Sequence, residues 1–239
     1  CTMLTEVACT AQGGTFRGPN VTCGSIICPR ILAKFVDALP IPPIAQPTSG
    51  TVGGVATYTA NIGQFQQTLH RDMPRTTVWG INGTYPGPTF EASTNQQVTV
   101  NWVNDLRDAQ GNFLTSHHLP VDTCLHGPST EGDAPRVVIH LHGAHVPPDS
   151  DGYPEDTLLP GEQDQYNYPN TQIPATLWYH DHSLGTTRLG VYMGVAGMYL
   201  IRDPFEQTLA LPSGEFEIPL LIQDRSFNND GSSSTLKGG

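Results

Sequence analysis

Glycine and proline interrupt this chain so often that long helices have little room to form. Of its 239 residues, 25 are glycine and 21 are proline. No window of helical length keeps an apolar period of 3.6 residues. Instead, residues 97–103 alternate Val98, Val100 and Trp102 with polar residues, as a half-buried strand does. The pattern favours many short strands joined by turns over a helical bundle.

Four other short apolar segments lie between turn-forming residues, and we expect each to form a strand. They are residues 137–141, 175–179, 195–201 and 217–222. Strands of this length, separated by Gly- and Pro-containing turns, are typical of antiparallel sandwiches and barrels. We therefore predict an all-β fold, a Greek-key β-sandwich or barrel.

The ends of the chain differ in composition from its middle. Residues 1–29 form a small Cys-rich module, and residues 30–54 include a Pro- and Gly-rich stretch with almost no charge. We expect that stretch to run extended over a surface. Residues 55–225 carry the strand pattern of the main domain. Residues 226–239 are largely polar and rich in Gly and Ser, which predicts a linker toward a further domain.

Four of the five cysteines lie within the first 28 residues, at Cys1, Cys9, Cys23 and Cys28. Such crowding in a module too small for its own core predicts two disulfides and an oxidising compartment. A zinc site with four cysteine ligands is the alternative, but the CxxC pairs typical of such sites are absent. Cys124 stands apart, and we expect it to be buried and unreactive because the sequence shows no group to activate it.

Charge and hydropathy exclude several classes of partner. The formal net charge is −11, which argues against nucleic acid or an anionic membrane surface as a partner. No apolar run approaches the ~20 residues that span a bilayer, so no transmembrane segment is predicted. The chain opens without Met or a basic-then-apolar leader, and we expect any signal peptide to be removed or to lie outside this sequence.

Two histidine pairs carry the chemistry: His140 with His142, and His180 with His182. Residues i and i+2 of a strand point to the same face, so each pair can offer two imidazoles to one metal or to two adjacent metals. Two such pairs on neighbouring strands would bring four imidazoles together. Imidazole suits copper, zinc, iron and nickel, so spacing alone leaves the metal open.

One alternative interpretation is a binuclear zinc hydrolase. Residues 140–145 read HLHGAH, which is close to the HxHxDH pattern of such enzymes. That pattern requires Asp where this chain has Ala144, and no alternation of strands and helices surrounds it. The hydrolase is therefore the weaker hypothesis.

The longer segments around these pairs resemble a known family. HLHGAHVPPDSDGYPED (140–156) and LWYHDHSLGTTRLGVYMGVAGMYLIRDP (177–204) are similar to the two first-domain copper motifs of multicopper oxidases. Residues 69–91, 119–123 and 219–227 resemble the same family. KFVDALPIPP (34–43) resembles its spore-coat laccase and bilirubin oxidase branch, whereas residues 1–29 resemble only small four-cysteine modules of secreted bacterial proteins.

The resemblance implies a cupredoxin-like first domain that provides half of a trinuclear copper cluster. It implies that His140 binds the type 2 copper and that His142, His180 and His182 bind the type 3 pair. The resemblance implies that the remaining cluster ligands and the type 1 copper site lie in cupredoxin domains missing from this chain. The sequence around Cys124 does not resemble a type 1 motif. The resemblance also implies that Asp151 assists proton delivery; the alternative is an ordinary turn carboxylate.

The activity implied is one-electron oxidation of phenolic, aromatic or metal-ion reductants, coupled to four-electron reduction of O₂ to water. This chain alone is expected to be inactive. A copper-binding cupredoxin module without turnover is the alternative. The expected location is secreted or periplasmic, at the bacterial cell envelope.

The remaining histidines and the tryptophans are expected to have ordinary roles. We expect surface or hydrogen-bonded positions for His70, His117, His118, His126 and His145, and core positions for Trp79, Trp102 and Trp178. Asp181, between two candidate ligands, should point away from them by strand alternation. There it either orients a neighbour or caps the end of the strand.

Overall fold

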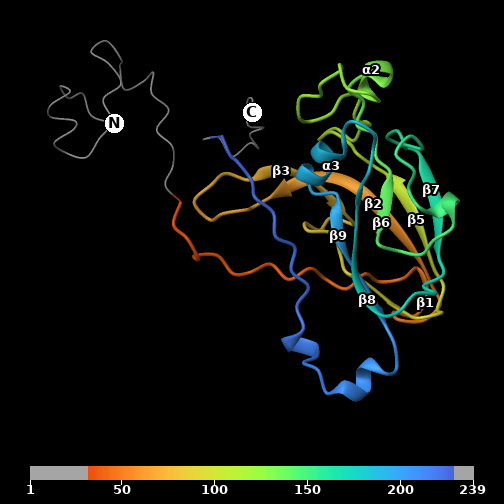
Figure 1. The fold of residues 1–239 in the computed structure, drawn as a ribbon. Helices are drawn as coiled ribbons and strands as arrows, with labels where there is room; N and C mark the ends of the chain where they lie inside the picture. The colour runs from red at the N-terminus through yellow and green to blue at the C-terminus, as the bar shows by residue number, and fades with distance from the viewer. Residues whose placement is uncertain (1–31, 229–239) are drawn as a thin grey trace, which may run out of the picture.

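A computed structural model describes residues 32–228, and within them two β-sheets pack face to face (Figure 1). The Cys-rich module at 1–29 and its predicted disulfides lie outside the described residues, and so does most of the predicted linker. The prediction of a mostly β chain is confirmed.

The larger sheet is built around one long strand, β2. Its first half pairs in parallel with β5, its second half pairs antiparallel with β3, and β5 continues antiparallel to β7. The short β1 borders the start of β2. The strands are β1 (Ser49–Gly50), β2 (Ala56–Gln67), β3 (Thr76–Ile81), β5 (Val98–Asn104) and β7 (Gln163–Tyr168).

The smaller sheet has the strand order β4-β9-β8-β6. Its outer pair β4 and β9 is parallel, whereas β9 pairs with β8, and β8 with β6, in antiparallel fashion. The strands are β4 (Phe90–Ser93), β6 (Ile139–His142), β8 (Ala175–Asp181) and β9 (Ala196–Arg202). The pairing of β6 with β8 brings together segments about 40 residues apart in sequence, and it is this pairing that brings the two histidine pairs side by side.

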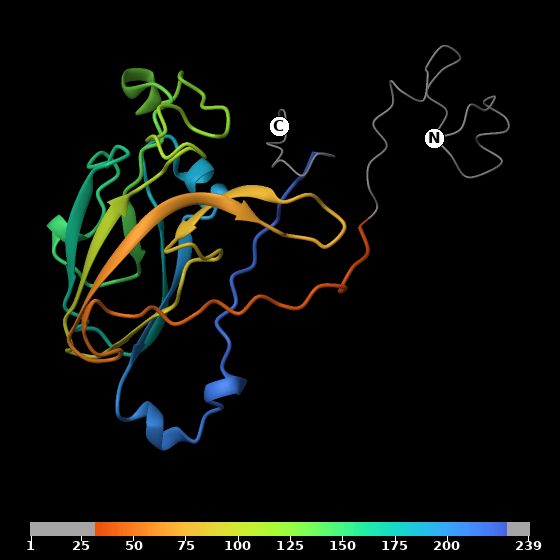
Figure 2. The same ribbon diagram turned by 180° about the vertical axis from the view of Figure 1, so that it is seen from behind.

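Within residues 32–228 the helices are few and short. The α-helices are α2 (Pro128–Glu131) and α3 (Thr187–Met193), and the 3-10 helices are η2 (Pro148–Ser150), η3 (Glu206–Leu209) and η4 (Gly214–Phe216). Both views show α2 and α3 at one end of the sandwich and η3 and η4 beyond the other (Figures 1 and 2). No helix in residues 32–228 has the length and hydrophobicity needed to cross a membrane.

The core lies between the two sheets and is rich in aromatic rings. Phe90 of β4 lies edge-on to Tyr58, Trp102 and Tyr179, with ring centroids 4.9, 5.9 and 5.4 Å away. The indole N–H of Trp102 donates to the hydroxyl of Tyr168 at 3.1 Å, so this buried polar group is satisfied. These contacts join strands from both sheets and hold them at a fixed distance.

Four of the five predicted strand segments are confirmed, as β5, β6, β8 and β9. The prediction of a strand at 217–222 is wrong. In the structure these residues follow η4 without joining either sheet, and Ile222 is 94% exposed. A strand needs a hydrogen-bonding neighbour as well as an apolar pattern, and neither sheet supplies one to this segment.

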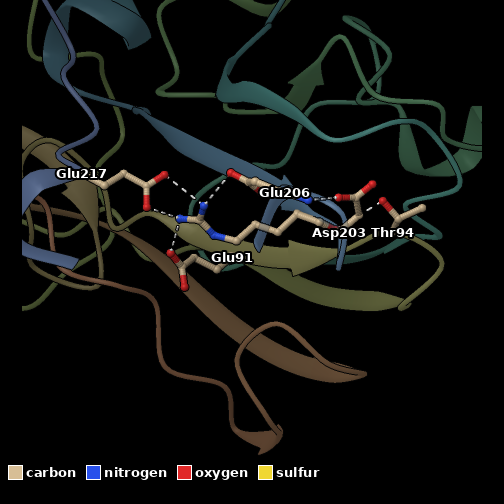
Figure 3. Close-up of polar contacts among 6 residues, drawn as sticks. Glu91, Thr94, Asp203, Glu206 and Glu217 are labelled. Carbon is tan, nitrogen blue, oxygen red and sulfur yellow. Dashed lines mark hydrogen bonds and ion pairs between the residues drawn. The ribbon is translucent and has the colours of Figure 1, made fainter. Parts of the chain in front are cut away.

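Arg202, the last residue of β9, ties the chain that follows to the smaller sheet (Figure 3). Its guanidinium donates to both carboxylate oxygens of Glu217 at 2.9 Å, and to Glu91 of β4 at 2.9 Å. A third carboxylate, that of Glu206 in η3, lies 3.3 Å away. One cation thus connects β4, β9, η3 and the residue after η4.

We predict that Arg202→Met lowers the free energy of unfolding by about 1–2 kcal/mol, because three carboxylates then lose their shared donor. Urea unfolding measures this loss. Limited proteolysis should show faster cleavage within 203–217. The matched control is Arg71→Met, which breaks an exposed pair with Asp37 and should change the free energy of unfolding far less, because exposed ion pairs contribute little. Equal effects of the two substitutions would contradict the role given to Arg202.

Candidate metal centre

The four candidate histidines lie on one face of the smaller sheet. In the β6–β8 ladder, His140 is directly opposite His180, and His142 is opposite Trp178. His182 follows the end of β8, where its N–H donates to the carbonyl of Val138 at 2.8 Å and extends the pairing by one bond. Because strand side chains alternate, the register places all four imidazoles on the face turned away from the core.

The imidazole rings form a compact group. The ring of His140 lies 5.5, 5.6 and 5.2 Å from those of His142, His180 and His182, between centroids. Nδ1 of His142 lies 3.2 Å from Nε2 of His180. The structure therefore brings together all four residues that the sequence singled out.

Backbone carbonyls fix the orientation of two of these rings. Nδ1 of His140 lies 2.6 Å from the carbonyl oxygen of Asp151, and Nδ1 of His180 lies 2.8 Å from that of Asp181. A carbonyl can only accept, so each Nδ1 carries the proton and each Nε2 keeps its lone pair. This is the arrangement found for imidazoles that bind metals through Nε2.

His180 is the most buried of the four, at 5% exposure. Burial lowers the pKa of His180 to about 4. Its imidazole is therefore neutral at physiological pH, and neutral imidazole is the form that binds metals. His140 and His182 are half-buried and His142 is exposed, so the group is open to solvent on one side.

Within residues 32–228, no three side chains of His, Cys, Asp or Glu converge as ligands of a single ion. The histidines instead approach one another in pairs, as His142 and His180 do. Structural metal sites use four ligands, and catalytic ones use three with one position open. The described part of the chain thus provides an incomplete ligand set for each ion.

Trp178 is part of this face, and the prediction that it lies in the core is wrong. It is half-buried, and its indole stacks on the ring of His180 at 4.0 Å and on that of His142 at 5.4 Å. Alternation along β8 gives the signal that sequence reasoning missed, because residues 178, 180 and 182 share one face. Trp79 and Trp102 are buried as expected.

Asp151 lies beside His140 without entering the histidine group. Its Oδ1 is 3.4 Å from Nδ1 of His140, and its side chain is 51% exposed. The residue also ends η2, where its N–H donates to the carbonyl of Pro148. It is therefore a turn residue that places a solvent-accessible carboxylate next to a candidate ligand.

The other histidines stay apart from this group or make ordinary contacts. His117 packs edge-on against Trp79, with ring centroids 4.5 Å apart, and burial lowers its pKa to about 4. His70 contacts the carbonyl of Ala33 at 2.9 Å. His118, His126 and His145 are exposed.

The expectation that Cys124 is buried is wrong. The residue is an exposed free thiol in the turn before α2, where its N–H donates to Oδ1 of Asp122 at 2.9 Å. The turn lies in the connection between the two sheets, outside the core, so its side chain faces solvent.

We predict that Gly152→Ala displaces the loop that carries Asp151. Gly152 has φ +76°, and a Cβ there would lie 2.1 Å from the carbonyl oxygen of Ile139 in β6. The expected loss of stability is on the order of 3 kcal/mol. Gly111→Ala is the control, since Gly111 has φ +85° with open space around it and should cost about 1 kcal/mol.

Urea unfolding measures both losses. ¹H–¹⁵N NMR of the ring nitrogens should show His140 losing its fixed Nδ1–H form in Gly152→Ala alone. An unchanged His140 ring in that variant would contradict the role of the Asp151 loop.

Known proteins share this arrangement of motifs. The sequence profile described as "Multicopper oxidase" matches residues 64–124 and 134–206, more than half of the chain. The laccase of Bacillus subtilis is 44% identical over 211 residues, a match that covers 84% of this chain and 40% of the relative. The bilirubin oxidase of Albifimbria verrucaria is 33% identical over 211 residues, covering 85% of this chain and 32% of the relative.

Solved structures show the same fold. A laccase from Pediococcus acidilactici superposes with a TM-score of 0.67 at 22% identity, covering 86% of this chain and 39% of that one. The McoA multicopper oxidase from Aquifex aeolicus superposes with a TM-score of 0.62 at 24% identity, covering 85% and 39%. The chain spans 36–40% of the length of three curated laccases. From the profile match, this chain belongs to the multicopper oxidase family.

Proposed function

We propose that this chain is the cupredoxin-like first domain of a copper-dependent oxidase. The intact protein would couple one-electron oxidation of phenolic, aromatic or metal-ion reductants to the four-electron reduction of O₂ to water. The observation that carries the proposal is the cluster of His140, His142, His180 and His182 on one sheet face, with ring centroids 5.2–5.6 Å apart along its contacts. Family membership supports the same conclusion.

The donor set fits copper. Imidazole is a good ligand for copper. Within residues 32–228, no carboxylate or thiolate joins these rings in a group of three ligands that could hold one ion. Nδ1 of His142 and Nε2 of His180 are separated by 3.2 Å, so these two nitrogens would be the ones closest at hand to hold one ion between them. Family membership also leaves the binuclear zinc hydrolase without support.

In this proposal His140 holds the type 2 copper, and His142, His180 and His182 hold the type 3 pair. Copper bound there supplies the redox chemistry of O₂ reduction. The protein keeps Nδ1 of His140 and His180 protonated through the Asp151 and Asp181 carbonyls. Because His180 Nε2 has a lone pair, the proton between it and His142 Nδ1 belongs to His142. That proton would have to leave Nδ1, for example by moving to Nε2 of the same ring, before both nitrogens could hold a metal.

We further propose that Asp151 delivers protons to the site. Its exposed carboxylate can take a proton from solvent, and its Oδ1 lies 3.4 Å from the His140 ring. A carboxylate that exchanges protons with water suits this role better than a buried one. The role does not require Asp151 to bind metal.

The other parts of the enzyme would come from domains missing from this chain. Each copper needs more ligands than residues 32–228 offer, and the type 1 site is among the missing parts. Exposed apolar side chains support a neighbour for this domain: Phe216 is 75% and Ile222 is 94% exposed. An open groove of about 340 Å³ beside Trp178 lies against residues 220–223. We also propose a secreted or periplasmic location, which the cysteine-rich composition of residues 1–29 favours.

Copper binding to this chain can be followed through Trp178. Because its indole stacks at 4.0 Å on His180, Cu²⁺ held by His180 should quench its fluorescence, whereas Zn²⁺, with a filled d shell, should not. We predict that Trp178→Phe removes the copper-dependent quenching and leaves the emission of Trp79 and Trp102. The measurement is a copper titration at constant pH.

Ligand variants test the assignment in the same titration. His180→Ala and His142→Ala should raise the copper concentration for half-quenching about tenfold or more, equivalent to about 1.4 kcal/mol. His118→Ala, which replaces an exposed histidine outside the group, should not. An unchanged half-quenching concentration in His180→Ala would contradict the copper site. Dioxygen consumption with a phenolic dye by this chain alone would contradict its dependence on the missing domains.

In the longer protein, Asp151→Asn should keep the full copper content and slow O₂ reduction. The slowing should increase as pH rises, because protons become scarce and the replacement cannot carry them. The experiment measures copper stoichiometry and turnover of O₂ across pH. Loss of copper, or normal turnover at every pH, would show that Asp151 is only a turn residue.

A further inference from the structure

The residue between the two histidines differs between the two pairs. In β6 it is Leu141, which is buried at 1% exposure and belongs to the hydrophobic core. In β8 it is Asp181, which points to the same interior side and has no exposed surface at all. A fully buried carboxylate is costly unless hydrogen bonds compensate for the lost water. This position therefore calls for an explanation that core packing does not give.

Asp181 holds together backbone groups at the end of the β6–β8 ladder. Its Oδ1 accepts from the N–H of Val138 at 3.1 Å, and from the N–H and hydroxyl of Ser183 at 3.2 and 2.7 Å. Asp181 is opposite Ile139, the first residue of β6, so both backbone N–H groups lie beyond the last ladder pair. Without this acceptor, two buried N–H groups would need other partners.

Each of these bonds adjoins a candidate ligand. Val138 is two residues before His140, and Ser183 directly follows His182. His182 donates its own N–H to the carbonyl of Val138 at 2.8 Å. The Asp181 carboxylate thus bridges the segment that leads into one histidine pair and the segment that leaves the other.

Helix α3 leaves room for this carboxylate. A Cβ at Gly190 would lie 2.1 Å from Oδ2 of Asp181, so only glycine allows the helix to pack this closely. Oδ2 itself has no hydrogen-bond donor among the described residues. All the hydrogen bonds to the carboxylate in this part of the chain go to Oδ1, which faces the ladder end.

We infer that Asp181 is a positioning residue: it locks the register of β6 against β8 at the ligand end and so keeps His182 and His140 at the separation that metal binding needs. It does not touch the metal, because its side chain lies on the opposite face of the strand. The inference rests on the proposed copper site and adds a residue to it.

The test compares Asp181→Ala with Asp181→Asn in the full 239-residue chain. Alanine removes the acceptor for all three donors. Asparagine keeps an oxygen where Oδ1 lies, removes the charge and puts an NH2 group in place of Oδ2, the oxygen that accepts no hydrogen bond among the described residues. We expect the alanine variant to bind Cu²⁺ at least tenfold more weakly, and the asparagine variant to stay within about threefold of the parent chain. Copper affinity is measured by Trp178 quenching.

A readout without metal accompanies the titration. Hydrogen exchange of the His182 amide, which pairs with Val138, should be at least tenfold faster in Asp181→Ala and near the parent rate in Asp181→Asn. Val100→Ala serves as the matched control, because Val100 is a buried residue of β5 in the other sheet. It should lower the urea midpoint without weakening copper binding. Should Asp181→Ala fail to fold, Ser183→Ala removes one donor and should give a smaller change in both readouts.

The outcomes separate the two hypotheses. If His180→Ala binds copper as tightly as the parent chain does, the proposed function is overturned, and this inference falls with it. If the parent binds copper through His180 but Asp181→Ala binds equally well, the positioning role alone is overturned. The same holds if Val100→Ala weakens binding as much, or if Asp181→Asn loses as much affinity as alanine, since acceptor geometry would then not be the cause.

Discussion

The antiparallel pairing of β6 with β8 is the interaction on which the candidate metal centre depends. It sets His140 opposite His180 and His142 opposite Trp178. A slip of one residue would turn one histidine pair into the core and bring Leu141 to the surface, because strand side chains alternate. The register is held from the inside by Leu141 and Tyr179, a buried ladder pair. At the ligand end it is held by the Asp181 carboxylate.

The two faces of the smaller sheet differ in chemical character. The inner face is apolar and aromatic, with Phe90, Tyr179 and Tyr199 packed against the other sheet. The outer face carries imidazoles and an indole, which stay available because the described chain covers them only in part. The packed inner face fixes the positions of the side chains on the outer face. Such fixed positions matter because metal ligands must be held near their binding geometry before the ion arrives. Asp181 is a charged residue on this apolar inner face, and we infer that it positions the histidines of the outer face.

The chain after β9 shows how a domain can be stable and still expose apolar surface. Arg202 anchors this segment through Glu91, Glu206 and Glu217, while Phe216 and Ile222 remain exposed. Further on, Arg225 packs between the rings of Tyr85 and Tyr192, 5.3 and 4.7 Å from their centroids. The segment is thus fixed at two points by cations, with apolar side chains between them. That arrangement is consistent with the proposal that further domains pack against this one.

The sequence by itself determined the class of fold and the candidate ligands, because both depend on local periodicity. Alternating apolar residues identified β5, and short apolar runs between turn-forming residues identified β6, β8 and β9. The i, i+2 spacing put each histidine pair on one strand face. Only the tertiary structure decided the features that depend on contacts between distant parts of the chain. An apolar pattern at 217–222 found no strand to pair with, and Cys124 lay in an exposed turn. Trp178 belonged to the histidine face, and Asp181 found three donors that no pattern within its own strand could reveal. Hydrogen-bond partners and ring contacts across strands are set by register, and register is a property of the folded chain.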